Sequence, residues 1–128
     1  MSEAEIPIKI ELLGVGSMEA RIIRHLGPIS AEAVLKKMPF VLRGRFGIGT
    51  SKYWMLLNVG IRKGPDSKAT KDAHKGDLLY NPKSDEIIIA LEDQEMPNKM
   101  NRIGKLLSDV DFFSKARNGL NCRLSKLK

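Results

Sequence analysis

The sequence contains a single cysteine, Cys122, among its 128 residues, which excludes an internal disulfide bond. A lone thiol is typical of a reducing compartment, so we expect a cytoplasmic protein. Long apolar runs are also missing: none approaches the roughly 20 residues that a membrane-spanning helix needs, and no membrane partner is expected. The opening residues, MSEAEIPIK, lack the basic and apolar regions of a signal peptide.

Aromatic residues make up only 5% of the chain, which leaves few platforms for stacking nucleic-acid bases. Cys/His fingers and the aromatic strand motifs of RNA-binding domains are absent as well. The chain nevertheless has 22 basic and 15 acidic residues, a net charge of +7 that attracts anions. Weak nucleic-acid binding therefore stays open as an unfavoured alternative. It would use the 60–76 segment and the basic C-terminus, with Arg123, Lys126 and Lys128.

Signals for nucleophilic or nucleotide chemistry are equally scarce. Cys122 alternates with Leu120 and Leu124, which predicts a small core residue and not a reactive thiolate. The glycine-rich run GRFGIG, residues 44–49, matches neither common nucleotide-binding fingerprint and indicates a corner of a barrel. No catalytic residue and no cofactor is predicted.

One cluster of metal-ligand residue types occurs, Asp72, His74 and Asp77. Their spacing fits no recognised metal site, and the neighbouring Lys71 and Lys75 would repel a cation. We expect a solvated loop here and no bound metal. The whole 60–76 segment is polar and aperiodic, which predicts a long surface loop.

Strand patterns dominate what is present. Residues 7–13 and 18–22 alternate apolar and polar side chains on either side of a Gly-rich turn, which predicts an antiparallel hairpin. The same alternation marks 40–46 and 120–124 as strands. Residues 52–59 are apolar on both faces, which predicts a strand covered on both sides, for instance by a barrel interior and an external helix.

Two short helices are expected. The first covers 30–38, with Ser30 as its N-cap and with Ile29 and Val34 forming a hydrophobic staple. The second lies within 98–110, where four apolar residues follow helical spacing: Met100, Ile103, Leu107 and Val110.

The sum of these elements predicts a mainly β protein. Many short strands with closely spaced turns and no βαβ rhythm favour a closed antiparallel barrel of about eight strands, capped by the two helices. Closure also removes the exposed strand edges that such apolar strands would otherwise present. We expect one domain over residues 1–128, with residues 1–6 disordered or frayed.

The run Gly76-Asp77-Leu78-Leu79-Tyr80-Asn81-Pro82, followed by a turn and the apolar strand 86–91, resembles the signature of a small prokaryotic cyclophilin-like family. Pro97, the Asn101–Leu106 stretch and the late strand after Asn118-Gly119 agree with that pattern. The resemblance implies a cyclophilin-like barrel of about eight strands with helices over its open ends. The family is largely without an assigned biochemical function, so the resemblance implies a fold and no particular activity.

The catalytic motif of true cyclophilins is not matched. Arg21-Ile22 offers the Arg-Ile pair of that motif, but no Phe precedes it and no Gln-Gly-Gly-Asp follows. No catalytic residue is therefore carried over from those enzymes. A diverged peptidyl-prolyl cis-trans isomerase stays open as an alternative function.

The favoured function is a non-catalytic binding module for an extended peptide or a small anionic ligand. Arg43 and Arg45 share one face of the strand 40–46, and Trp54 follows just across a predicted turn. Two guanidinium groups beside aromatic rings can hold an anion or a peptide. Tyr80 can pack in the barrel while its hydroxyl reaches the rim. The competing interpretation of the two arginines is an outer barrel face on which they extend into solvent.

Overall fold

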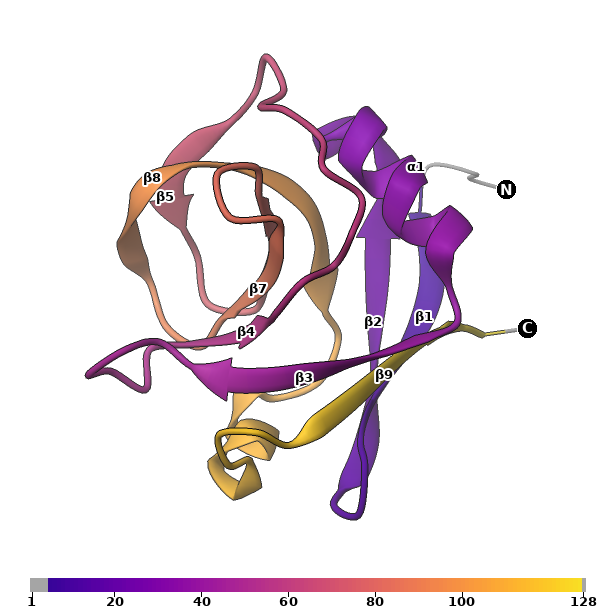
Figure 1. Ribbon diagram of the computed structural model, residues 1–128, viewed down its shortest axis with the longest axis vertical. Coiled ribbons are helices and arrows are strands. Elements are labelled where there is room, and N and C mark those ends of the chain that lie inside the picture. The colour runs from indigo at the N-terminus through magenta and orange to yellow at the C-terminus, as the bar shows by residue number, and fades with distance from the viewer. Residues whose placement is uncertain (1–4, 128) are drawn as a thin grey trace.

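The computed structural model describes residues 5–127, which contain nine strands, one α-helix and two 3-10 helices (Figure 1). The strands are β1 (Glu5–Leu12), β2 (Gly16–Ile23), β3 (Phe40–Phe46), β4 (Tyr53–Leu56), β5 (Thr70–Ala73), β6 (Asp77–Asn81), β7 (Glu86–Ala90), β8 (Gln94–Leu106) and β9 (Asn121–Lys126). The helices are η1 (Arg24–Leu26), α1 (Pro28–Lys37) and η2 (Val110–Lys115).

Eight of the strands close into an antiparallel barrel in the order β2-β1-β9-β3-β4-β7-β6-β8. The barrel closes because β8 also pairs with β2, with Ala20 opposite Leu106 and Ile22 opposite Gly104. β5 is an additional strand that pairs with the first half of β8. The expected mainly β, closed antiparallel barrel of about eight strands is thereby confirmed.

The barrel strands bury two separate cores because their side chains alternate between its inner and outer faces. Trp54, Tyr80 and Ile89 belong to the large inner core. Leu79 and Ile88 belong instead to a smaller outer core, which β5 and β8 complete with Ala73, Met96 and Met100. This arrangement explains why β4, β6 and β7 are apolar on both faces, although the outer cover is a pair of strands and not the expected external helix.

The expected helix within 98–110 is wrong, because these residues form most of β8 and the turn that follows it. Their helical spacing arises from an irregular strand. β8 exchanges β5 for β6 and β2 along its length, and its register against β6 shifts between Leu78 and Leu79. Across the shift, Ile103 and Leu106 both enter the inner core although they are three positions apart, whereas Met100 enters the outer core.

Two short helices cover opposite ends of β2. α1 follows β2 through the single turn η1, and its Ala31, Val34 and Leu35 enter the inner core. η2 supplies Phe113 to the same core, and its Phe112 ring would lie 3.2 Å from a Cβ atom at Gly16, where β2 begins.

α1 begins earlier than expected and without the expected cap. Its first residue is Pro28, a position where proline is favoured because its missing N–H would have no helical partner. Ser30 is therefore inside the helix, where it is buried and bonded to Asn101. Ile29 is 60% exposed and forms no staple.

Two expected irregular regions contain strands. The N-terminal stretch expected to be frayed reaches Ile6, whereas β1 already pairs Glu5 with Ile23; residues 1–4, like Lys128, lie outside the described residues. The expected 60–76 loop contains β5. Asp77 is also not in a solvated loop. It is 1% exposed, its carboxylate accepts the His74 N–H at 2.9 Å, and it lies 3.7 Å from Nε of Arg102.

Candidate functional site

After β4 the chain leaves the sheet, and residues 57–66 cross the barrel beside α1 without forming a strand (Figure 1). Such a segment must satisfy its backbone polar groups by other means. Asn58, Gly60 and Arg62 all have positive φ angles, 57°, 85° and 49°, which turn successive N–H groups toward one side. The conformation of this 57–66 segment therefore depends on the acceptors that the barrel presents to it.

The main acceptor is the carboxylate of Asp85, in the β6–β7 turn. Its Oδ2 accepts the N–H of Gly60 at 2.7 Å, and its Oδ1 accepts the N–H groups of Ile61 at 3.2 Å and Arg62 at 2.9 Å. Three consecutive N–H groups around an anion form a nest. Burial alone would raise the pKa of Asp85, but hydrogen bonds from Tyr80 and from these N–H groups outweigh it, and the pKa is lowered.

Tyr80 is the second anchor. Its ring is fully buried in the inner core, and its hydroxyl donates a 2.6 Å hydrogen bond to Oδ1 of Asp85. The same hydroxyl accepts the N–H of Lys63 at 3.2 Å. Burial and the bond to Asp85 raise the pKa of Tyr80 to about 12, so the hydroxyl stays protonated at neutral pH.

The third anchor is Asn101 of β8, which is fully buried. Its Nδ2 donates to Oγ of Ser30 at 2.8 Å and to the carbonyl oxygen of Gly64 at 2.9 Å, while its Oδ1 accepts the N–H of Asp66 at 2.7 Å. One side chain thus ties α1, the 57–66 segment and the barrel wall together. The spacing between α1 and the segment is set by buried polar contacts.

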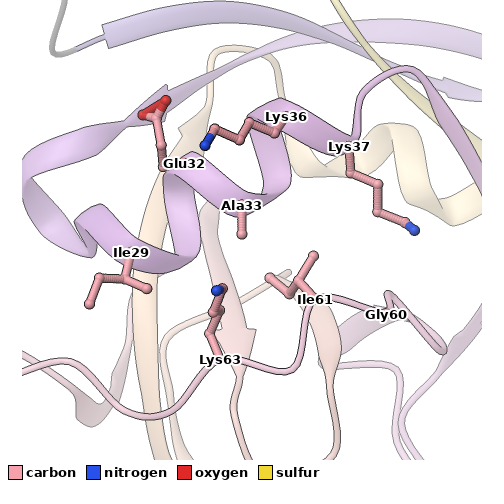
Figure 2. A pocket seen from close by; sticks show the side chains of 8 residues that line it. All are labelled: Ile29, Glu32, Ala33, Lys36, Lys37, Gly60, Ile61 and Lys63. Atoms are coloured by element: carbon pink, nitrogen blue, oxygen red, sulfur yellow. The ribbon is translucent and has the colours of Figure 1, made fainter.

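A groove of about 470 Å³ lies between α1 and this segment (Figure 2). Ile29, Ala33 and Lys37 are four residues apart on the helix and so occupy one face of it. Ile61 and Lys63 reach toward that face from the facing segment (Figure 2). We call this the α1 groove. It has an apolar surface from Ile29, Ala33 and Ile61 and two ammonium groups from Lys37 and Lys63.

The charge of the α1 groove is positive. Glu32 also borders it, but its Oε1 lies 3.1 Å from Nε of Arg24, so its charge is balanced by that arginine. Lys36 also borders the groove, and its side chain extends along the helix toward Glu32 (Figure 2). Within residues 5–127 the ammonium groups of Lys37 and Lys63 form no ion pair and no hydrogen bond. A ligand with a negative group would find both available.

The four residues expected to form a site lie in different places. Arg43 and Arg45 are on the outer face of β3, exposed and half-buried respectively, and Nε of Arg45 donates to the carbonyl oxygen of Phe46. Trp54 faces the opposite way, fully buried against Phe46 with ring centroids 4.9 Å apart. The structure therefore does not bring the arginines and the tryptophan to one surface. Tyr80 alone reaches the α1 groove, as a support for its wall.

Sequence reasoning missed the residues that build the groove. In the sequence, Lys36, Lys37 and Lys63 look like ordinary surface lysines. No sequence pattern indicates that they lie close together in the fold. Asp85 offered a weak signal, because an Asp in a turn that directly follows the Asn81-Pro82 pair often accepts backbone N–H groups. Its partners are more than 20 residues away, at Gly60, Ile61 and Arg62, so only the tertiary structure identifies them.

No protein-family model matches the sequence, and no curated protein matches it either. Solved structures with a similar fold do exist. The hypothetical protein AF2241 from Archaeoglobus fulgidus, known from its solution structure, is 13% identical and superimposes with a TM-score of 0.77, covering 99% of this chain and all of that one. McbB, solved in complex with tryptophan, is 12% identical with a TM-score of 0.75, covering 92% of this chain. This chain spans 44% of McbB. At these identities the similarity shows the fold alone.

Two kinds of feature are absent from residues 5–127. None of the helices there has the length and apolar character needed to cross a membrane. The described residues also contain no group of three or more His, Cys, Asp and Glu side chains placed to hold a metal ion.

Proposed function

We propose that this protein is a non-catalytic binding module whose α1 groove holds a small ligand with an anionic group and an apolar body. The observation that carries the proposal is the pair of unpartnered ammonium groups, Lys37 and Lys63, beside an apolar surface. Sites for small molecules combine mostly apolar walls with a few placed polar groups. The size of the groove, about 470 Å³, is in the range of such sites.

Preorganisation supports the same function. A rigid wall loses little conformational entropy when a ligand binds, which lowers the free-energy cost of binding. Here the wall formed by the 57–66 segment is held by Asp85, Tyr80 and Asn101, all on barrel strands or their turns. The side-chain hydrogen bonds of these anchors go to the 57–66 segment and to α1, so they fix the position of this wall.

The proposal also includes two broader expectations from the sequence. One is the cyclophilin-like relationship, supported by the eight-strand barrel and by the position of the Gly76–Pro82 run at its β6–β7 hairpin. The other is a cytoplasmic location. The proposed site, in contrast, lies in the α1 groove and not on the outer face of β3, where the sequence led us to expect it.

Hexanoate is a suitable probe because it combines a carboxylate with an apolar chain, and hexan-1-ol is its uncharged counterpart. Titration of the isotope-labelled protein, followed through backbone amide chemical shifts, should show hexanoate perturbing Gly60, Ile61 and Lys63. Lys37→Gln/Lys63→Gln should weaken hexanoate about tenfold, since each exposed ion pair contributes up to about 1 kcal/mol. The alcohol should bind more weakly and be indifferent to that change.

Two controls separate the groove from general surface charge. Lys71→Gln/Lys75→Gln removes the same charge from exposed lysines that do not border the groove, and it should leave hexanoate affinity unchanged. Arg43→Ala/Arg45→Ala examines the site expected from the sequence. The proposal fails if hexanoate weakens equally in the groove variant and the lysine control, or only in the arginine variant.

A further inference from the structure

A second hollow lies at the other end of the helix from Lys37. This hollow, of about 420 Å³, lies among His25, Pro28, Pro65, Asp66 and Lys68, and Ile29 borders both it and the α1 groove. We call it the Asp66 hollow. The 57–66 segment runs antiparallel to α1, because Gly60 lies beside Lys37 and Pro65 lies beside Pro28. The two hollows therefore lie end to end along the helix, with Ile29 between them, and we call the two together the channel.

The two ends of this channel differ in charge. Lys37 makes the end near Gly60 positive, and Lys63 adds a second positive charge between that end and Ile29 (Figure 2). At the other end the carboxyl group of Asp66 has no hydrogen-bond donor for its buried Oδ2, which lies against Gly27. Lys68 does not compensate it, since its ammonium group donates to the carbonyl oxygen of His25 at 3.3 Å. Burial is the cause that raises the pKa of Asp66, as expected for a carboxylate without a cationic partner.

The length of the channel limits what can bridge both ends. α1 has 10 residues, which at 1.5 Å per residue spans about 15 Å. A free amino acid is much too short to reach from Asp66 to Lys37. An extended peptide advances about 3.3 Å per residue, so four to five residues span about the same distance.

We propose that the ligand is a short extended peptide of four to five residues with free termini, lying along α1. Its amino group pairs with Asp66, its terminal carboxylate pairs with Lys37, and Lys63 lies beside it between the two ends. Its apolar side chains cover Ile29, Ala33 and Ile61. This inference rests on the proposed function, because it uses the same lysines, and adds the class of ligand and its direction.

The test uses the synthetic peptide Ala-Leu-Ala-Leu-Ala in three forms: with free termini, with an acetylated amino group and with an amidated carboxyl group. Affinities come from amide chemical-shift titrations of the full chain. Acetylation should weaken binding to the unaltered protein about fivefold, and amidation should weaken it by a similar factor. The dipeptide Ala-Leu should bind at least tenfold more weakly than the pentapeptide, because it cannot reach both ends.

The variant Asp66→Asn tests whether the amino group of the peptide lies at Asp66. Asn keeps the size of the side chain, and this variant should weaken the free peptide about fivefold while leaving the acetylated peptide and hexanoate unchanged. Asp72→Asn, at an exposed position on β5, is the matched control and should have no effect. Acetylation of the peptide provides the same information without any substitution, so the test does not depend on how Asp66→Asn folds.

The outcomes distinguish this inference from the proposed function. If hexanoate depends on Lys37 and Lys63 but acetylation of the peptide changes nothing, the peptide inference is overturned and the anion site stands. If hexanoate does not depend on the lysines, the proposed function is overturned, whatever the peptide does. If the dipeptide binds as well as the pentapeptide, the channel is not spanned and the inference is likewise wrong.

Discussion

The hydroxyl of Tyr80 donates a 2.6 Å hydrogen bond to Oδ1 of Asp85, and this pair connects the inner core of the barrel to the wall of the α1 groove. Asp85 in turn holds three consecutive N–H groups of the 57–66 segment. The geometry of the groove therefore depends on the protonation of two side chains that a ligand in the groove does not need to contact.

Asp85→Asn should destabilise the protein by about 1–3 kcal/mol, because an amide has a single accepting oxygen and cannot accept both the Gly60 N–H and the donors that now bind Oδ1. The backbone is not the reason, since Asp85 has φ 58° and asparagine tolerates that region well. Urea unfolding measures the change. Asp72→Asn, at an exposed position, serves as the control. An Asp85→Asn variant as stable as that control would show that the nest contributes nothing to folding.

Tyr80→Phe should remove part of the alkaline sensitivity of the protein. The pKa of Tyr80 is raised to about 12, so its contribution to the free energy of unfolding is present below about pH 10 and is lost as the pH rises toward 12. We expect Tyr80→Phe to be less stable than the unaltered protein at neutral pH, by about 1–2 kcal/mol. That difference should narrow above pH 10. Parallel urea titrations from pH 8 to about 12 measure it, and a constant difference would contradict the assignment.

Gly104→Ala should weaken the β2–β8 pairing that closes the barrel. A Cβ atom at Gly104 would overlap the carbonyl oxygen of Arg21 on β2, and a backbone atom cannot move aside as a side chain can. We expect a loss of about 2–3 kcal/mol or more by thermal or urea unfolding. Gly64→Ala is the matched control, since a Cβ atom there meets nothing within 4 Å, and it should change stability by no more than about 0.5 kcal/mol. Equal stabilities for the two variants would show that the β2–β8 contact is not tight.

Cys122 should react with thiol reagents only when the protein opens. It is fully buried, and burial, with a further contribution from Glu11, raises its pKa to about 12. At neutral pH the folded protein should therefore label far more slowly than the urea-unfolded chain, and Gly104→Ala should accelerate labelling. Ser51→Cys in a Cys122→Ala background places the thiol at an exposed position and should label at once. Rapid labelling of Cys122 in the folded protein would contradict its place in the core.

Much of the barrel follows from local patterns. The alternation in residues 7–13, 18–22, 40–46 and 120–124 predicts β1, β2, β3 and β9, because a strand with one buried face must alternate. The Asn81-Pro82 turn between two apolar runs likewise predicts the β6–β7 hairpin. These features depend only on residues that are near one another in the chain.

β8 shows where local reasoning fails. Met100 and Ile103 have helical spacing, yet they enter two different cores of one irregular strand. These residues form a strand because β6 and β2 both pair with them, and the barrel closes only through that pairing. Helical spacing in 98–110 is real, but the pairing of distant strands outweighs it.

The sequence by itself determined the fold class, the burial of Cys122 and the excess of positive charge, since each of these depends on composition or on periodicity along a strand. Only the tertiary structure decided where that charge can act. Lys37 and Lys63 are 26 positions apart and face one groove because Asp85, Tyr80 and Asn101 hold the 57–66 segment beside α1. The same tertiary arrangement separates Arg43 and Arg45 from Trp54, since neighbouring positions on a strand point to opposite faces of the barrel wall.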